Sequence, residues 1–279
     1  MVGSRRVDAG RWSIGRSAVM HWPHLIVDKS PHPCPYLPNR TAVLPMRLPL
    51  APLDGAQFDA CLANGDRRQG ILLYRPECPD CRACEPIRLD IDEFIADRTQ
   101  KRMFRLGQTR LTQTVGRPKV DAQRVQLYNL HKRLRGLDMG DGHATAADYA
   151  GFLAESCVDT LEIAYHLNGQ LVGIAVVDRG HTSLSAVYCC YDPRVVGLSV
   201  GVYSIMAQVE LCRQWGLRWL YLGFYVAGCR AMLYKARYGP HQRLIDGHWQ
   251  PMDRQIVQPA PAQIAQAETA KIAQAETAK

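Results

Sequence analysis

Long hydrophobic stretches are missing from this chain of 279 residues. The longest clear apolar run, Leu171 to Val177, is well short of the ~18 residues that a membrane-spanning helix needs. The first residues carry several arginines but no continuous hydrophobic segment, so we expect neither a membrane span nor a secretory signal. Without an export signal, we expect a cytoplasmic protein. In that reducing compartment its ten cysteines favour metal binding over disulfides.

Acidic residues are missing between Arg98 and Lys119, where the sequence has seven basic residues. A helix face of one sign repels itself and gains no support from i, i+4 ion pairs, and the net charge of +8 also favours a polyanionic partner. We therefore predict a face that binds nucleic-acid phosphates, with an ordinary solvated face as the alternative. The residues that share this face by their helical spacing are Arg98, Lys101, Arg102 and Arg105.

Three cysteines, Cys78, Cys81 and Cys84, lie within seven residues at C-x2-C-x2-C spacing. Thiols this close make poor disulfides, whereas the same spacing wraps thiolates around one metal ion or cluster. Interleaved prolines restrict the loop and reduce the entropy lost when the ligands converge. Cys34 is the best candidate for a fourth ligand. Thiolates suit zinc and iron–sulfur clusters alike, so both remain open, and buried structural thiols are the alternative.

The hydrophobic pattern predicts an α+β protein. A strand over 70–75 and a returning strand over 86–91 would place the cysteine loop at the tip of a hairpin. Composition divides the chain into a flexible extension over 1–30, a small cysteine-rich N-terminal domain over 31–120, a domain of regular elements over 121–250, and a Gln/Ala-rich tail over 251–279.

The second domain has a characteristic order of elements. We predict a helix over 146–157, three strands over 161–167, 171–178 and 183–191, a helix over 199–215, a strand over 218–222 and a final strand over 241–249. This order resembles the GNAT superfamily of N-acyltransferases, which implies a mixed sheet with helices and makes 121–250 the catalytic domain. The loop from Gly197 to Gly201 would present backbone N–H groups to a phosphate, unless it is a plain turn.

Several motifs narrow the resemblance, and they span residues 31 to about 250. They are Pro31-His-Pro-Cys-Pro-Tyr-Leu37, Tyr74-Arg-Pro-x-Cys-x-x-Cys-x-x-Cys-x-Pro-x-Arg88, Phe94 with Arg98-x-Gln-Lys-Arg102, Leu184-Ser-Ala-Val-Tyr188, Tyr191-Asp-Pro193, Tyr221-Leu-Gly223 and Cys229-x-x-Met-x-Tyr-Lys235. Together they resemble the aminoacyl-tRNA–protein transferases, which comprise the bacterial aspartate/glutamate leucyltransferases and the related arginyl-tRNA–protein transferases.

The resemblance implies transfer of an aminoacyl group, leucine in the first instance, from its tRNA to the α-amine of proteins that begin with Asp or Glu. The new N-terminus marks the protein for degradation by the N-end rule. The expected partners are aminoacyl-tRNA and such proteins, with no membrane and no nucleotide cofactor. Arginine transfer is the first alternative. A coenzyme A-dependent N-acetyltransferase and a non-catalytic, metal-bearing RNA-binding module are the others.

Residue types suggest roles in that reaction. Arg75 or Arg88, beside the cysteine loop, is expected to grip the acidic side chain of the acceptor, unless both form structural ion pairs. Tyrosines and one aspartate at or near strand ends are the catalytic candidates, with core packing and a turn as the alternatives, namely Tyr188, Asp192 and Tyr221. The remaining substrate-binding candidates are Tyr191, Tyr234 and Lys235.

Overall fold

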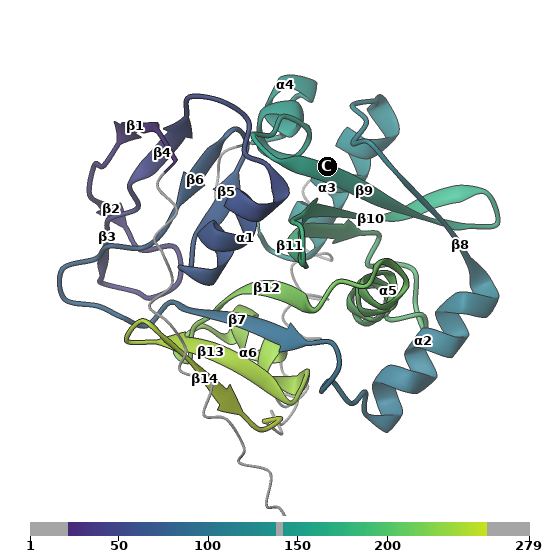
Figure 1. Ribbon diagram of the computed structural model, residues 1–279. Coiled ribbons are helices and arrows are strands. Elements are labelled where there is room, and N and C mark those ends of the chain that lie inside the picture. The colour runs from purple at the N-terminus through teal and green to yellow at the C-terminus, as the bar shows by residue number, and fades with distance from the viewer. Residues whose placement is uncertain (1–21, 138–141, 256–279) are drawn as a thin grey trace, which may run out of the picture.

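An eight-stranded mixed sheet is the centre of the computed structural model, which describes residues 22–137 and 142–255 (Figure 1). From edge to edge its strands are β14 (His248–Met252), β13 (His241–Ile245), β7 (Glu85–Asp90), β12 (Trp219–Tyr225), β11 (Ser183–Tyr191), β10 (Gln170–Arg179), β9 (Asp159–Leu167) and β8 (Leu111–Gly116). Strands β11 and β12 run parallel, and the other neighbouring pairs run antiparallel.

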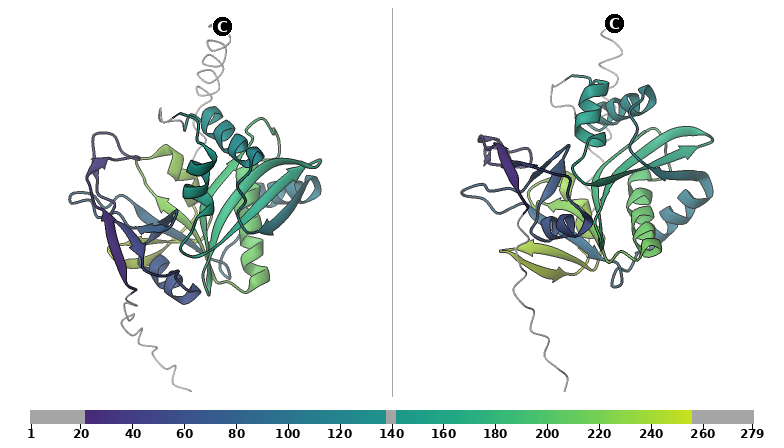
Figure 2. Two further views of the ribbon diagram at one scale, coloured as in Figure 1. Left: turned by 90° about the horizontal axis from the view of Figure 1, so that it is seen from above. Right: turned by 45° about the horizontal axis from the view of Figure 1, so that its top comes forward.

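A smaller antiparallel sheet lies beside the large one, and it stays on the same side in the two further views (Figure 2). Its strands, in order, are β1 (His24–Asp28), β4 (Met46–Pro49), β6 (Leu72–Tyr74) and β5 (Arg67–Gln69). A two-stranded ladder and one helix complete this N-terminal part: β2 (His32–Pro33), β3 (Thr41–Ala42) and α1 (Gly55–Ala63).

Helices cover both faces of the large sheet. Alternate residues of β10 belong to different cores, because Ala175 and Val177 pack toward one face whereas Ile174 and Val176 pack toward the other. The first face is covered by α2 (Arg98–Arg110) and α5 (Val200–Trp215). The second is covered by α3 (Ala122–Leu134), α4 (Ala146–Tyr149) and a π-helical turn, Ala150–Ala154. After β12 come the short α6 (Arg230–Leu233) and a 3₁₀ turn, Tyr234–Arg237.

Helix α2 shows how local sequence sets an element. The Asp97 side chain accepts from the Gln100 backbone N–H while Gln100 reaches back to the Asp97 N–H, so a capping box starts the helix. Met103 and Gly107 lie on the buried side of this helix. A Cβ at Gly107 would lie only 2.1 Å from the Tyr203 ring of α5, so glycine is needed for the two helices to approach.

Most of the predicted acyltransferase-like order is confirmed. The three antiparallel strands β9, β10 and β11 are followed by α5 and by β12, which pairs parallel with β11. Asn168 and Gly169 both have positive φ in the tight turn between β9 and β10. Gly216 closes α5 with a φ of +66°. No helix in the two described ranges has the length and apolar character to cross a membrane.

Four predictions about elements need correction. The strands β6 and β7 that flank the cysteine loop belong to different sheets, so the loop is a connection between sheets and not a hairpin tip. The final strand is a hairpin, because Asp246 and Gly247 turn the chain between β13 and β14. The helix predicted over 146–157 ends at 154 and changes to a π-helical turn. Residues 24–28, assigned to the flexible extension, form β1.

The predicted boundary at residue 120 does not separate the two sheets. Strands β7 and β8 come from the 31–120 segment, yet both are members of the large sheet. Antiparallel strands pair by proximity in space, and hydrophobic pattern alone does not say which sheet a strand joins. The residues 1–21 of the predicted extension and 256–279 of the predicted tail lie outside the described residues.

Candidate active site

The parallel strands β11 and β12 separate after a short paired stretch. Their ladder ends at Ser185 and Tyr221, although β11 continues to Tyr191 and β12 to Tyr225. A β-bulge at Val187 bends β11, since Val176 faces Tyr188 but Val177 faces Ala186. The separation leaves a split in the sheet where backbone groups need other partners.

Two cationic side chains fill this split. Arg67 of β5 donates from Nη1 to the Ser185 hydroxyl (3.0 Å) and from Nη2 to the Ala186 carbonyl (2.5 Å). Lys235, in the 3₁₀ turn, donates from Nζ to the Phe224 carbonyl (2.7 Å). Each cation is only 7% exposed. Together they satisfy one carbonyl on each of the separated strands.

Gly223 lies between the two cations. A Cβ at this position would be 3.3 Å from Lys235 Nζ and 3.6 Å from Arg67 Nη2, and the φ of +88° is one that favours glycine. Burial, with the nearby positive charge of Arg67, lowers the pKa of Lys235 to about 7. Burial also lowers the pKa of Arg67. The split is thus an enclosed place that holds two basic side chains, and the ammonium form of Lys235 is disfavoured there.

The open end of the split is lined by tyrosines. Tyr191 ends β11 and lies beside Gly201 at the start of α5, where a Cβ would be 3.4 Å from the Tyr191 ring. Tyr234 is 45% exposed, but its hydroxyl end lies toward Cys189 and Tyr191, where burial raises its pKa to about 12. The structure therefore brings together three predicted substrate-binding residues: Tyr191, Tyr234 and Lys235.

Tyr188 packs in an aromatic cluster between β11 and α3. Its ring centroid lies 5.5 Å from that of Tyr128 and 5.6 Å from that of Phe152. Burial raises the pKa of Tyr188 well above its usual range. Beside this cluster, His131 Nδ1 lies 2.9 Å from the Tyr191 carbonyl oxygen, and burial lowers the pKa of His131. A neutral imidazole therefore ties α3 to the end of β11.

Asp192 lies directly after β11 in the role that an Asp-Pro turn predicts. Its carboxylate accepts from Arg194 Nε at 2.9 Å and from Nη2 at 2.8 Å, and it also accepts from the Arg194 backbone N–H. These hydrogen bonds lower the pKa of Asp192. The negative charge of Asp192 is therefore paired with Arg194, two residues further along the chain.

Arg88 and Tyr221 form a separate block on β7 and β12. The Arg88 guanidinium lies between two indoles, 3.6 Å from the Trp219 ring centroid and 4.0 Å from that of Trp249. Its Nε and Nη2 both donate to Gln242 Oε1, and Nη1 donates to the Tyr221 hydroxyl at 3.0 Å. All three of its nitrogens are engaged within the protein.

Arg75 lies apart from Arg88. It donates to the Asn64 carbonyl at 2.9 Å, its Nε lies 3.9 Å from Asp66, and its side chain is 40% exposed. Arg75 lines the pocket that contains the cysteine loop. Of the two predicted arginines, it is the one that a ligand in that pocket can meet.

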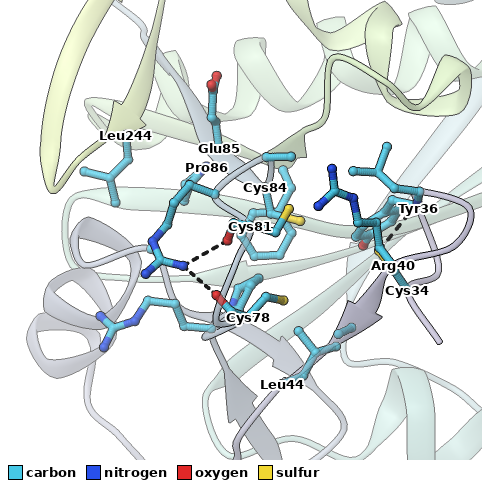
Figure 3. Close-up of a pocket in the computed structure, with 18 of the residues that line it drawn as sticks. Cys34, Tyr36, Arg40, Leu44, Cys78, Cys81, Cys84, Glu85, Pro86 and Leu244 are labelled. Carbon is cyan, nitrogen blue, oxygen red and sulfur yellow. Dashed lines mark hydrogen bonds between the residues drawn. The ribbon is translucent and has the colours of Figure 1, made fainter. Parts of the chain in front are cut away.

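The four predicted cysteine ligands line one pocket of about 400 Å³ (Figure 3). Cys34 comes from the connection between β2 and β3, and the other three come from the connection between β6 and β7. The β13–β14 turn closes a further side of the pocket. Tertiary structure thus brings the three cysteines of the C-x2-C-x2-C run to one pocket with the candidate fourth ligand: Cys34, Cys78, Cys81 and Cys84.

The donor chemistry of this pocket suits a thiophilic metal. The Cys34 Sγ accepts from the Leu37 N–H and the Cys78 Sγ from the Val43 N–H, both at 3.4 Å. Burial and the neighbouring cysteines raise the pKa of Cys84 to about 12, so a nearby cation would be needed to ionise this thiol at neutral pH. Within the described residues, however, no three His, Cys, Asp or Glu side chains are arranged to hold a metal ion. The metal remains a prediction.

The basic face of α2 is as the spacing predicts. The four predicted side chains are exposed and line one surface hollow. Within the described ranges, none of them forms an ion pair. The helix packs against α5 through its opposite side. These residues are Arg98, Lys101, Arg102 and Arg105.

Comparison with known proteins places the chain in a family. Residues 32–102 match the model of the N-terminal part of the arginine-tRNA-protein transferases, and residues 123–245 match that of the C-terminal part. The chain belongs to this arginine-tRNA-protein transferase family. Its curated relatives include proteins named aspartate/glutamate leucyltransferase. The one from Chromobacterium violaceum is 38% identical over 80% of this chain and 92% of its own length. Those from Marinobacter nauticus and Aeromonas hydrophila are 36% and 35% identical, over 80% of this chain and 93% and 92% of their lengths.

Solved structures resemble the chain more loosely. The C-terminal domain of a putative lysylphosphatidylglycerol synthetase from Agrobacterium fabrum aligns with a TM-score of 0.43 and 13% identity, covering 76% of this chain and 68% of that one. A GCN5-related N-acetyltransferase from Kribbella flavida aligns with a TM-score of 0.29 and 13% identity over 50% and 47% of the two chains.

Sequence reasoning missed Arg67 and the bulge at Val187. Arg67 and Arg68 are adjacent arginines in a short strand next to the apolar run of β6, and both are buried. Two charged residues at a buried strand are uncommon unless they have partners or ligands, so the pair is a usable signal. The bulge has no signal in the sequence, because it depends on the register between β10 and β11.

Proposed function

We propose that this protein transfers leucine from leucyl-tRNA to the α-amine of proteins that begin with Asp or Glu, marking them for degradation. The observation that carries the proposal is that the motifs on which the resemblance to the aspartate/glutamate leucyltransferases rests come together at one site. Tyr191, Tyr234, Lys235 and Gly223 come from three motifs separated in the sequence, and they surround the split between β11 and β12.

The chemistry asks little of a general base. An aminoacyl ester is already activated, and an α-amine with a pKa of ~8 is partly neutral at physiological pH. The amine nitrogen attacks the ester carbonyl to give a tetrahedral oxyanion. Its collapse breaks the bond to the ribose oxygen, which leaves as a hydroxyl once it has taken the proton that the amine gives up. Alignment of amine and ester is the main task, and good alignment is worth ~7–11 kcal/mol.

The split offers two features for this reaction. The bulge in β11 and the start of α5 each leave backbone N–H groups outside the regular ladder or helix pattern, and such donors can stabilise an oxyanion. The exposed end, with Tyr191 and Tyr234, has the aromatic rings on which a terminal adenine stacks. The basic face of α2 lies on the helix that packs against α5, which suits a tRNA that enters from that side.

The cysteine pocket has a supporting role in the proposal. A zinc ion or iron–sulfur cluster held by its four cysteines would fix the connection between β6 and β7, and with it the position of Arg75 at the pocket wall. A closed all-thiolate site is structural and leaves no open position for substrate. No step of the transfer is assigned to it.

The test uses leucyl-tRNA labelled in the amino acid and a peptide that begins with Asp. We expect labelled peptide with leucine at its N-terminus. The matched control is the same peptide with an acetylated α-amine, which should accept nothing. Absence of transfer from both leucyl- and arginyl-tRNA, or transfer to the acetylated peptide, would overturn the proposal.

Arginine is the second candidate, because the matching family models are described as arginine-tRNA-protein transferase. Parallel reactions with arginyl-tRNA separate the two. Labelled arginine in the product with no labelled leucine would make this chain an arginyltransferase acting at the same site.

A further inference from the structure

Two buried basic side chains meet in the split, and in the described part of the chain neither forms an ion pair with a carboxylate. Arg67 donates to a hydroxyl and a carbonyl, and Lys235 donates to a carbonyl and lies 3.2 Å from the sulfur of Met232. Within residues 22–137 and 142–255, neither cation belongs to an ion pair. From different elements, both reach the place that a Cβ of Gly223 would occupy.

The neighbouring arginine shows how this fold treats a buried charge that is structural. Arg68 Nε lies 2.7 Å from Asp178 Oδ2, and both side chains are fully buried. Its Nη1 also donates to two backbone carbonyls. A buried charge without such a partner is costly, and here two like charges share one enclosure. An anion bound between Arg67 and Lys235 would compensate both charges and lower the cost of burying them.

We propose that Arg67 and Lys235 together bind the side-chain carboxylate of the acceptor's first residue. This inference rests on the proposed function and names the residues that give the enzyme its preference for Asp and Glu. The bound carboxylate accepts from the guanidinium on one side and from the ammonium on the other. Gly223 leaves room for it, because any side chain at that position would lie against both cations.

The enclosure favours a carboxylate over a phosphate. Each cation is nine-tenths buried, which suits the tip of one short side chain. A phosphodiester is bulkier and carries chain on both sides, and the exposed arginines of α2 already provide for it. Two residues in the wall of the cysteine pocket adjoin the cations: the carbonyl of Phe224 accepts from Lys235, and Tyr36 lies near Arg67. In this proposal the acceptor side chain enters from that pocket.

The experiment measures kcat/KM for peptides that begin with Asp or Asn, using the same leucyl-tRNA. Asn matches Asp in shape but lacks the charge. We expect the parent to prefer Asp roughly tenfold to a hundredfold, the range that one charged hydrogen bond supplies. Arg67→Met and Lys235→Met should each remove most of that ratio, because kcat/KM for the Asp peptide should fall much further than kcat/KM for the Asn peptide. Arg40→Met is the matched control, because Arg40 is an exposed arginine of the same pocket, and its ratio should equal the parental one.

Each other outcome is decisive. An unchanged Asp/Asn ratio in both variants overturns the inference, and a parallel rise in KM for leucyl-tRNA with either peptide assigns the anion to a phosphate instead. A fall in the ratio that appears only together with loss of bound metal shows that the cations serve the thiolates, and this too overturns it. If Arg67→Met does not fold, Arg67→Lys keeps the charge without the fork, and Lys235→Met decides the question. A parent that transfers leucine to neither peptide refutes the proposed function, which is a separate result.

Discussion

The adjacent arginines Arg67 and Arg68 of β5 should differ in how much stability the protein loses when each is replaced by methionine. Arg68 holds Asp178 at 2.7 Å where neither side chain is exposed, and Asp178 otherwise accepts from the Thr160 hydroxyl at 2.6 Å. Arg68→Met leaves a buried carboxylate with one neutral donor. Removing one partner of a buried pair costs about 3–5 kcal/mol. At roughly 2–4 °C per kcal/mol for a chain of this size, the melting temperature should fall by about 6–20 °C.

Arg67→Met should cost much less. It leaves two neutral acceptors, the Ser185 hydroxyl and the Ala186 carbonyl, each worth about 1–3 kcal/mol if unsatisfied. The same substitution removes an unpaired buried charge, which offsets several kcal/mol. We therefore expect a change in the free energy of unfolding within about 2 kcal/mol of zero, together with the loss of acid preference described above.

Urea unfolding followed by circular dichroism measures both variants, and Arg68→Met/Asp178→Leu serves as the control. Replacing both partners with apolar side chains should recover most of the stability that Arg68→Met loses, since buried pairs exchanged for packed apolar residues are often neutral. Two results would refute this reasoning. One is an Arg67→Met protein as destabilised as Arg68→Met, and the other is a double variant no more stable than Arg68→Met alone.

Three further predictions concern the metal, the tRNA and pH. Elemental analysis of active protein should find zinc or iron, and replacing Cys78 with Ser should lower both metal content and activity; active protein without either metal excludes the site. Lys101→Gln combined with Arg102→Gln should weaken tRNA binding and reduce the salt slope by roughly 2, whereas an unchanged slope makes the α2 face an ordinary solvated surface. Burial lowers the pKa of His241 from 6.5 to about 4. Between pH 6.5 and pH 4, His241 is therefore protonated in the unfolded chain but neutral in the folded chain. Stability should thus fall by a few kcal/mol as pH drops from 6.5 to 4, and His241→Phe should flatten this dependence in urea titrations at several pH values.

Local sequence was sufficient for the elements that carry their own stop and start signals. Asn168-Gly169 predicts the turn between β9 and β10, Gly216 predicts the end of α5, and the i, i+3, i+4 spacing predicts the exposed basic face of α2. These depend on backbone preferences and on periodicity, both of which are written within a few neighbouring residues.

Pairing between distant segments was beyond such reasoning. The hydrophobic pattern of 86–91 predicts a strand, but it does not say that β7 leaves the neighbouring β6 and inserts between β12 and β13. Asp246-Gly247 is a local turn signal, and it divides the single strand that the hydrophobic pattern predicts over 241–249 into β13 and β14.

The candidate site shows the same division. Residue types and motifs predicted Tyr191, Tyr234 and Lys235 as substrate-binding residues. The cysteine spacing, with Cys34 added as a fourth candidate, predicted a metal site, and these four cysteines line one pocket. The partner of Lys235 was not readable, because Arg67 lies 168 positions earlier in the chain and meets it only where β11 and β12 separate. Tertiary packing likewise decides that Arg68, and not Arg67, pairs with a carboxylate. The sequence determines which charged residues the protein has, whereas tertiary packing determines which of them form ion pairs, because the partners come from distant segments.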